Sequence, residues 1–235
     1  MKKENILRDH YNNVIYSEDH WTLLKRKREN AIRLLEIFVN EGLKPFLHGS
    51  IARGDVHNTS DIDIIFIEQI PIFQIEFILD KKGYKNYFRE IIMATPLDAI
   101  KLYIHLSELE TITIPLSKLD QKFLEFYDFG GKMNLNQLKS DNRIAGIDKR
   151  LVLIKPNLQG HEEMSIIGNE VIAAKKVRVS INTINERKNV LLRREKYGRT
   201  GVFLKKEIQM NETTEVALKK LANRKSIIRK KLYSL

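Results

Sequence analysis

The sequence predicts an α/β chain of the α+β type, followed by a mainly helical and strongly basic region. Two short apolar runs, Leu43–His48 and Ile62–Glu68, are typical of strands. Apolar residues recur at helical spacing over Glu18–Glu41, so a helix is expected before the first strand. Residues 1–140 hold 19 Lys and Arg against 20 Asp and Glu, whereas residues 141–235 hold 22 against 10. This shift predicts two domains, 1–140 and 141–235.

The basic second domain indicates a polyanionic partner. The formal net charge of the chain is +11, and the excess lies entirely in residues 141–235. Clustered Lys and Arg attract phosphate backbones, so nucleic acid, either RNA or DNA, is the expected partner. A solvated basic surface without a partner is the alternative. The absence of cysteine excludes disulfides and fits a cytoplasmic protein, and no apolar run is long enough for a membrane span.

The first domain is predicted to alternate helices and strands. Ser17 caps the helix over Glu18–Glu41, and Gly42 ends it. Residues 1–16 show no clear period. The further elements expected in this domain are a helix over Pro71–Leu79, a strand over Tyr84–Ala94, a hairpin of Ala99–Leu106 with Thr111–Leu116, and a helix from Ser117 to Gly130.

Helices are predicted to dominate the second domain. A strand over Arg150–Lys155 and a connector over Gly160–Met164 precede two helices, Glu170–Val177 and Ile181–Lys196, the second capped by Ser180. The remaining elements expected are a wing over residues 198–204 and a basic helix over Thr213–Tyr233.

The two helices of the second domain resemble a helix–turn–helix of the DNA-binding kind. Ala174 lies at the expected helix crossing, and Val179 and Ile184 are the expected inner apolar contacts. Arg178 stands where this pattern usually has glycine, and a residue there takes a left-handed conformation. An ordinary helical hairpin is the alternative.

The outward side chains of the second helix are the expected contacts to nucleic acid. Amides can read base edges, whereas arginine and lysine contact phosphates. The residues are Asn182 and Asn185 for bases, and Arg187, Lys188, Arg193 and Arg194 for phosphates.

The most informative stretch lies between the two strands of the first domain. Gly49 has no Cβ, so its backbone can approach a phosphate closely, and Ser50 begins a helical turn whose free N–H groups suit an anion. Side chains alternate along a strand, so Asp61 and Asp63 point the same way and repel each other unless a cation binds between them. Each half alone has an ordinary interpretation, as a strand-to-helix turn or a solvated strand edge.

The combination resembles the signature of the DNA polymerase beta superfamily of nucleotidyltransferases, in particular its minimal and archaeal members. That signature reads apolar-Gly-Ser, then about ten residues, then Asp-apolar-Asp-apolar. The spacer containing Arg53, Gly54, Asp55 and Ser60 is similar to that of minimal members. The resemblance is specific over residues 43–68, and it implies a mixed sheet backed by helices.

The resemblance also implies an activity, the transfer of a nucleoside monophosphate from an NTP to an acceptor hydroxyl. Asp61 and Asp63 would hold two Mg²⁺ or Mn²⁺ ions, as in two-metal sites. Gly49 and Ser50 would bind the β- and γ-phosphates.

Two further assignments leave alternatives open. Arg53 would neutralise triphosphate charge, or else form a salt bridge with Asp55. The superfamily normally has a third carboxylate on a neighbouring strand, and Asp98 is the leading candidate because it opens a strand. Capping its own turn is the alternative role for Asp98. Glu108 and Glu110 are weaker candidates.

These features together predict a metal-dependent nucleotidyltransferase that acts on a nucleic acid, with RNA preferred. One alternative is an antitoxin-like minimal nucleotidyltransferase that modifies a protein hydroxyl. Another is a non-catalytic DNA-binding regulator that keeps the fold without turnover. The sequence does not indicate which NTP is used or the oligomeric state.

Overall fold

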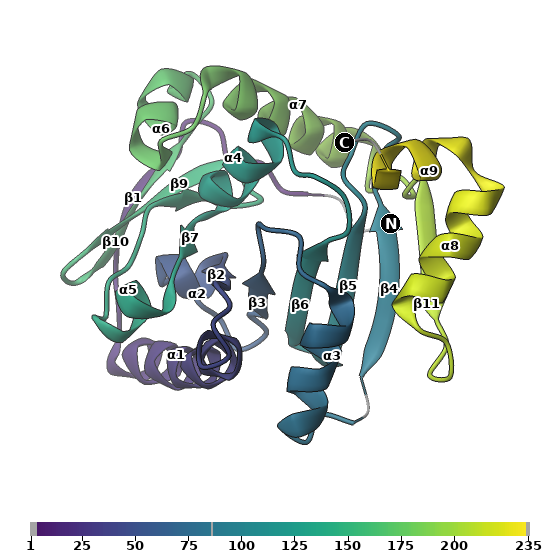
Figure 1. Ribbon diagram of the computed structural model, residues 1–235. Coiled ribbons are helices and arrows are strands. Elements are labelled where there is room, and N and C mark those ends of the chain that lie inside the picture. The colour runs from purple at the N-terminus through teal and green to yellow at the C-terminus, as the bar shows by residue number, and fades with distance from the viewer. Residues whose placement is uncertain (1–3, 86, 234–235) are drawn as a thin grey trace.

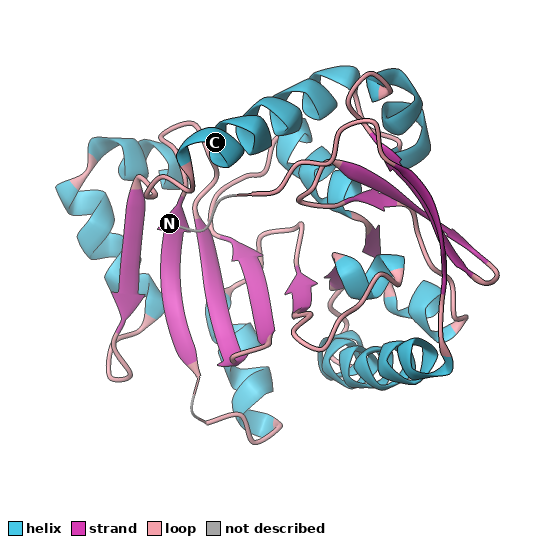
Figure 2. Cartoon of the chain, turned by 180° about the vertical axis from the view of Figure 1, so that it is seen from behind, coloured by secondary structure: helices cyan, strands magenta, loops and turns pink. Residues whose placement is uncertain are grey.

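Two β-sheets form the framework of the protein in the computed structural model, which describes residues 4–85 and 87–233. The strands of the larger sheet are β2 (Phe46–His48), β3 (Ile62–Ile65), β4 (Phe88–Met93), β5 (Lys101–Ser107), β6 (Glu110–Pro115), β7 (Lys132–Met133) and β11 (Leu204–Ile208). Their order across the sheet is β11-β4-β5-β6-β3-β2-β7. The sheet is mixed, as predicted, because β3 runs parallel to β6 and the other pairs are antiparallel. Its long strands stand side by side in Figure 2.

The smaller sheet joins the N-terminal segment to the middle of the chain. Its strands are β1 (Tyr11–Ile15), β8 (Gly146–Ile147), β9 (Val152–Asn157) and β10 (Gly160–Ser165), in the order β1-β10-β9-β8. The prediction of a connector over Gly160–Met164 was wrong, because this segment is strand β10. Its inward side chains include His161 and Glu163, which are polar, so apolar alternation could not reveal the strand.

Helices cover the larger sheet and bridge the two sheets. They are α1 (Glu18–Val39), α2 (Ser50–Arg53), α3 (Ile72–Lys81), α4 (Gln121–Gly130), α5 (Leu135–Lys139), α6 (Glu170–Val177), α7 (Ile181–Tyr197), α8 (Thr214–Arg224) and α9 (Ser226–Tyr233). The Ser17 side chain caps α1 by accepting from the His20 N–H, as predicted. Figure 1 shows α7 running along the top of the molecule, from the small sheet toward α8 and α9.

The helix predicted to begin at Ser117 begins later. Asp120 caps α4, since its carboxylate accepts from the backbone N–H of Phe123. The hydroxyl of Ser117 instead accepts from the backbone N–H of Ile100, so Ser117 fastens the strand before it. The strand predicted over Tyr84–Ala94 is also shorter in the structure, and residue 86 lies outside the described residues.

The C-terminal segment completes the larger sheet. Residues 198–204 were expected to form a wing, but β11 pairs with β4 along the sheet edge. The expected single helix over Thr213–Tyr233 is two helices, because Lys225 between α8 and α9 is extended. Ala217 and Ile228 from these helices lie in the main hydrophobic core. The predicted division at residue 140 therefore runs between partners of both sheets.

The helix pair α6–α7 has the predicted interior. Ala174, Val179 and Ile184 pack in a second hydrophobic core under the smaller sheet. Arg178 has φ of 58°, the left-handed conformation that its position predicted. DNA binding by this pair stays a prediction. None of the helices in residues 4–85 and 87–233 combines the length and apolar character that crossing a membrane requires.

Replacing Gly160 by Ala should destabilise the fold by about 2 kcal/mol, a typical overpacking penalty. A Cβ at Gly160 would lie 2.0 Å from the backbone carbonyl oxygen of Val14, so β1 could not pair closely with β10. Thermal unfolding measures the effect. Gly201→Ala is the matched control, because a Cβ there meets nothing within 4 Å. Equal melting temperatures for both variants would contradict the close β1–β10 contact.

Candidate active site

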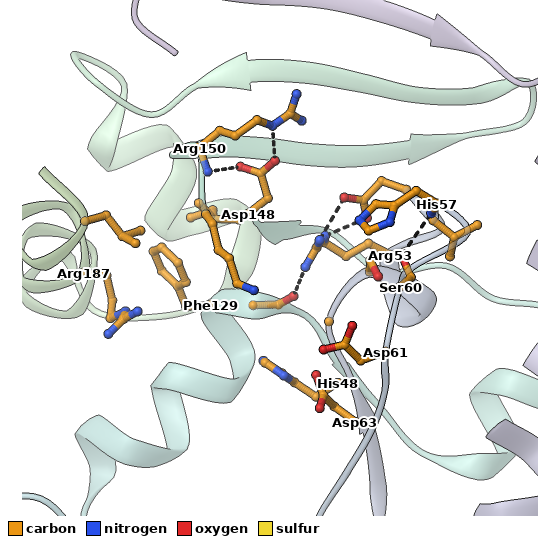
Figure 3. A pocket seen from close by; sticks show the side chains of 18 of the residues that line it. His48, Arg53, His57, Ser60, Asp61, Asp63, Phe129, Asp148, Arg150 and Arg187 are labelled. Atoms are coloured by element: carbon orange, nitrogen blue, oxygen red, sulfur yellow. Dashed lines mark hydrogen bonds and ion pairs between the residues drawn. The ribbon is translucent and has the colours of Figure 1, made fainter. Parts of the chain in front are cut away.

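A pocket of about 1000 Å³ opens between the two sheets, with α7 on one side (Figure 3). Most of the first-domain candidates meet there, although they come from three different elements. The sequence-predicted residues that line the pocket are Gly49, Ser50, Arg53, Asp61 and Asp63 from the first domain, and Arg187 and Arg194 from the second.

Gly49 brings the motif turn close to the aspartates. Its φ of 90° and ψ of −149° lie where only glycine is comfortable, so another residue would strain the backbone. A Cβ at Gly49 would lie 3.9 Å from Oδ2 of Asp63. Ser50 follows as the first residue of α2. The turn and the carboxylates therefore form one side of the pocket.

Asp61 and Asp63 line the same pocket, as the alternation along the strand predicted. Among the described residues, neither carboxylate has a hydrogen bond or an ion pair. Burial raises the pKa of Asp63 to about 6, and the charge of Asp61 adds to this shift. Two adjacent carboxylates without a counter-charge suit a divalent cation, since Mg²⁺ commonly binds one or two carboxylates together with substrate phosphates.

A third carboxylate does not join this pair. Asp98 caps its own turn, where Oδ2 accepts from the backbone N–H of Thr95 at 2.8 Å, and it does not line the pocket. Glu108 and Glu110 also lie outside the pocket lining. On β6, Thr111 is the residue in register with Asp63. Within the described residues, no group of three or more His, Cys, Asp or Glu side chains could hold a metal ion.

Arg53 is buried and already paired. Its Nε and Nη2 donate to the two carboxylate oxygens of Asp55 at 2.9 and 2.8 Å, and its Nη1 donates to the carbonyl oxygen of Gly130 at 2.6 Å. The alternative role, a salt bridge with Asp55, is the one the geometry shows. Arg53 therefore positions the turn, and triphosphate binding by its guanidinium stays a prediction.

His48 lies on the pocket side of β2, in register with Asp63. Its ring packs against Phe126 and Tyr127, with centroid separations of 6.0 and 5.4 Å. Burial, with a contribution from the positive charge of Arg53, lowers the pKa of His48 to about 3. Its Nε2 is buried and has no hydrogen-bond partner among the described residues. The imidazole is therefore neutral at physiological pH.

The side chains predicted to contact nucleic acid divide between two faces of α7. Asn182, Asn185 and Arg193 are exposed, as expected for an outer face. Lys188 instead forms an ion pair with Glu170 on α6. Arg187 and Arg194 point into the pocket, so their expected position on the outer face was wrong. Arg187 turns inward because its guanidinium packs over the rings of Phe126 and Phe129.

Several pocket residues escaped the sequence reasoning. Lys149 and Arg150 follow a polar stretch that offered no motif. His161 and Glu163 come from β10 and belong to a polar network: the Tyr16 hydroxyl and His161 Nδ1 lie 2.7 Å apart, and Arg150 donates to Glu163 at 2.6 Å. Only tertiary contacts bring these residues to the motif. Their one sequence signal is the alternation of polar residues along β10.

The comparison with protein families agrees with the motif. Residues 14–126 match the family model described as a nucleotidyltransferase domain. This span contains the Gly49–Ser50 turn and both pocket aspartates. No curated protein and no solved structure shows a significant match to the chain. The match supports a place for this part of the chain in the nucleotidyltransferase superfamily, and it supports general nucleotidyl transfer.

Replacing Asp63 by Asn should stabilise the metal-free protein at pH 7.5 by on the order of 2 kcal/mol. The folded pKa of Asp63, about 6, lies above its ordinary value of 3.8, so the ionised carboxylate opposes folding. That penalty grows as the pH rises from about 4 to 6 and is complete above it. The gain should therefore vanish near pH 3.5. Thermal unfolding in a chelator measures it, and a loss of stability at pH 7.5 would contradict the shift.

Replacing Asp98 by Ala should lower stability by about 1 kcal/mol and leave nucleotidyl transfer unchanged within about twofold. The variant loses the hydrogen bond that caps the turn at Thr95, a contribution of that size. Melting temperature and initial transfer rate are the two readouts. A fall in rate of about 100-fold at unchanged melting temperature would instead make Asp98 a general base.

Proposed function

We propose, from the nucleotidyltransferase domain that residues 14–126 match, that this protein transfers a nucleoside monophosphate from an NTP to a hydroxyl on a nucleic acid, with RNA preferred. The observation that carries the proposal is the pairing of two uncompensated carboxylates, Asp61 and Asp63, with the Gly49–Ser50 turn in one pocket. The turn suits phosphate oxygens, and the carboxylates suit the cation that accompanies them.

Asp61 and Asp63 would hold Mg²⁺ or Mn²⁺. A divalent cation there supplies neutralisation of phosphate charge and polarisation of the reacting phosphoryl group. These two carboxylates, with phosphate oxygens and water, provide ligands for one such ion. A second ion, as the superfamily resemblance implies, would depend on ligands from the substrates, since Asp98 lies outside the pocket lining.

The protein's own groups bind and orient the NTP. The backbone at Gly49 admits a phosphate where a side chain would obstruct it, and the Ser50 hydroxyl offers a donor beside it. The acceptor oxygen then forms a bond to the α-phosphorus, the bond to the β-phosphate bridging oxygen breaks, and pyrophosphate leaves with the electron pair. The hydroxyl proton passes to solvent or to a phosphate oxygen.

A nucleic-acid acceptor is favoured by the charge of the second wall of the pocket. Lys149, Arg187 and Arg194 line it and come from the basic half of the chain. Cations in this position favour a phosphate-bearing acceptor over a protein hydroxyl. The exposed face of α7 with Asn182 and Asn185 is free to contact the same nucleic acid.

Replacing both Asp61 and Asp63 by Asn should abolish metal-dependent NTP binding. The change keeps the shape of both side chains and removes the negative charges that bind the cation. Calorimetric titration of ATP and GTP in Mg²⁺ and in Mn²⁺ measures it. Asp98→Asn serves as the control for charge outside the pocket and should bind as wild type does. Metal-dependent binding that survives in the double variant would contradict the site.

The acceptor class is tested by incubating the wild-type protein with each α-labelled NTP and total cell RNA or protein. Label in RNA, dependent on Asp61 and Asp63, is the expected result. Label in protein would favour the antitoxin-like alternative. No label in either, together with binding to a defined DNA duplex, would favour a non-catalytic regulator.

A further inference from the structure

Three cations in the pocket have no counter-charge. Arg53 pairs with Asp55, Arg150 with Asp148 and Glu163, and Arg199 with Glu4. Across the described part of the chain, the side chains of Lys149, Arg187 and Arg194 form no ion pair or hydrogen bond with protein groups. The first wall of the pocket is therefore acidic at Asp61 and Asp63, and the facing wall carries unpaired positive charge.

Arg187 is the most unusual of the three. Its guanidinium lies 4.7 Å from the ring centroid of Phe126 and 5.9 Å from that of Phe129. Its Nε is buried and has no partner among the described residues. Burial lowers its pKa to about 10, and the charge of Arg194 contributes to this shift. A largely buried arginine without an anion is costly, and a bound oxyanion would recover that cost through several charge-assisted hydrogen bonds.

The position of Arg187 separates it from the motif turn. Figure 3 shows Arg187 and Phe129 on one side of the pocket, and Arg53, Ser60 and Asp61 on the other. The motif turn belongs to the Arg53 side, because α2 contains both Ser50 and Arg53. An in-line displacement at phosphorus places the attacking and leaving oxygens on opposite sides. Pyrophosphate that leaves near Ser50 thus requires the acceptor to approach from the side of α7.

We propose that Arg187 and Arg194 form the acceptor subsite, where they bind the backbone phosphate next to the reacting hydroxyl at a single-stranded RNA end. The inference rests on the proposed nucleotidyl transfer. Phe126 and Phe129 beside the guanidinium give an aromatic surface on which an unpaired base stacks. A duplex cannot enter the pocket to meet Arg187, whereas a strand end can. This use of α7 differs from insertion of a recognition helix into a groove.

RNA binding tests the subsite without any turnover. The probe is a 5′-labelled single-stranded 12-mer RNA with a free 3′-hydroxyl, titrated by fluorescence anisotropy at several salt concentrations. Arg187→Gln/Arg194→Gln should bind at least 10-fold more weakly than wild type. Its log–log salt slope should be shallower by about 1.4, since each phosphate contact contributes about 0.7 on single strands. A blunt 12-bp duplex should bind more weakly than the single strand to wild type.

Three controls make the result specific. Lys175→Gln/Lys196→Gln removes the same charge from exposed positions on α6 and α7 and should change RNA affinity by less than about threefold. Arg187→Lys/Arg194→Lys keeps the charge and should restore most of the affinity. Asp61→Asn/Asp63→Asn should keep RNA affinity while it loses NTP binding. Melting curves verify that each variant is folded, and the Lys pair substitutes if the Gln pair is not.

The outcomes separate this inference from the proposed function. RNA affinity that resists the Arg187 and Arg194 substitutions, or falls equally in the Lys175 and Lys196 control, overturns the subsite. Weakened NTP binding with unchanged RNA affinity also overturns it, since the cations would then serve the triphosphate. Equal binding of the duplex overturns the strand-end assignment. A wild-type protein that binds RNA through these arginines but neither binds NTP nor transfers label would overturn the proposed function alone.

Discussion

The buried ion pair of Arg53 with Asp55 is the interaction on which the geometry of the pocket depends. The guanidinium also donates to the carbonyl oxygen of Gly130 at 2.6 Å and so fastens α2 to the end of α4. Glycines make room for it, because a Cβ at Gly131 or Gly146 would lie 2.9 or 2.7 Å from its methylene carbons. Removing one partner of a buried pair typically costs about 3–5 kcal/mol. One side chain thus sets the motif turn against the start of the smaller sheet.

The parts of the site that could be predicted are those whose chemistry is local in sequence. Gly49 needs its special backbone conformation because of the turn it makes, and Asp61 and Asp63 share a face because of strand geometry. The helix over residues 18–39 was also predictable, since its apolar spacing and its Ser17 cap lie within one segment. The third carboxylate was not, because sequence proximity to a strand start could not distinguish a metal ligand from a turn cap at Asp98.

The missing parts depend on which segments meet. Nothing near Arg187 indicates that α7 turns this side chain toward Phe126 on α4, about sixty residues earlier in the chain. Local pattern likewise identified a strand near Leu204 but not its partner, and pairing with β4 decides that it extends a sheet and forms no wing. On β10 the buried positions carry His161 and Glu163, so the apolar alternation that identifies strands is absent. These are failures of pairing information, and local propensity was largely sound.

The late pairing of β11 with β4 has a consequence for synthesis on the ribosome. Translation at about 5–20 residues per second leaves roughly 5–20 s between the appearance of β4 and that of its partner, which lies more than a hundred residues further on. During that interval β4 is an unpaired sheet edge with Ile91 and Met93 among its apolar residues, the kind of edge that templates aggregation. A nascent chain is thus most vulnerable in mid-translation, when chaperone binding at this edge would matter most.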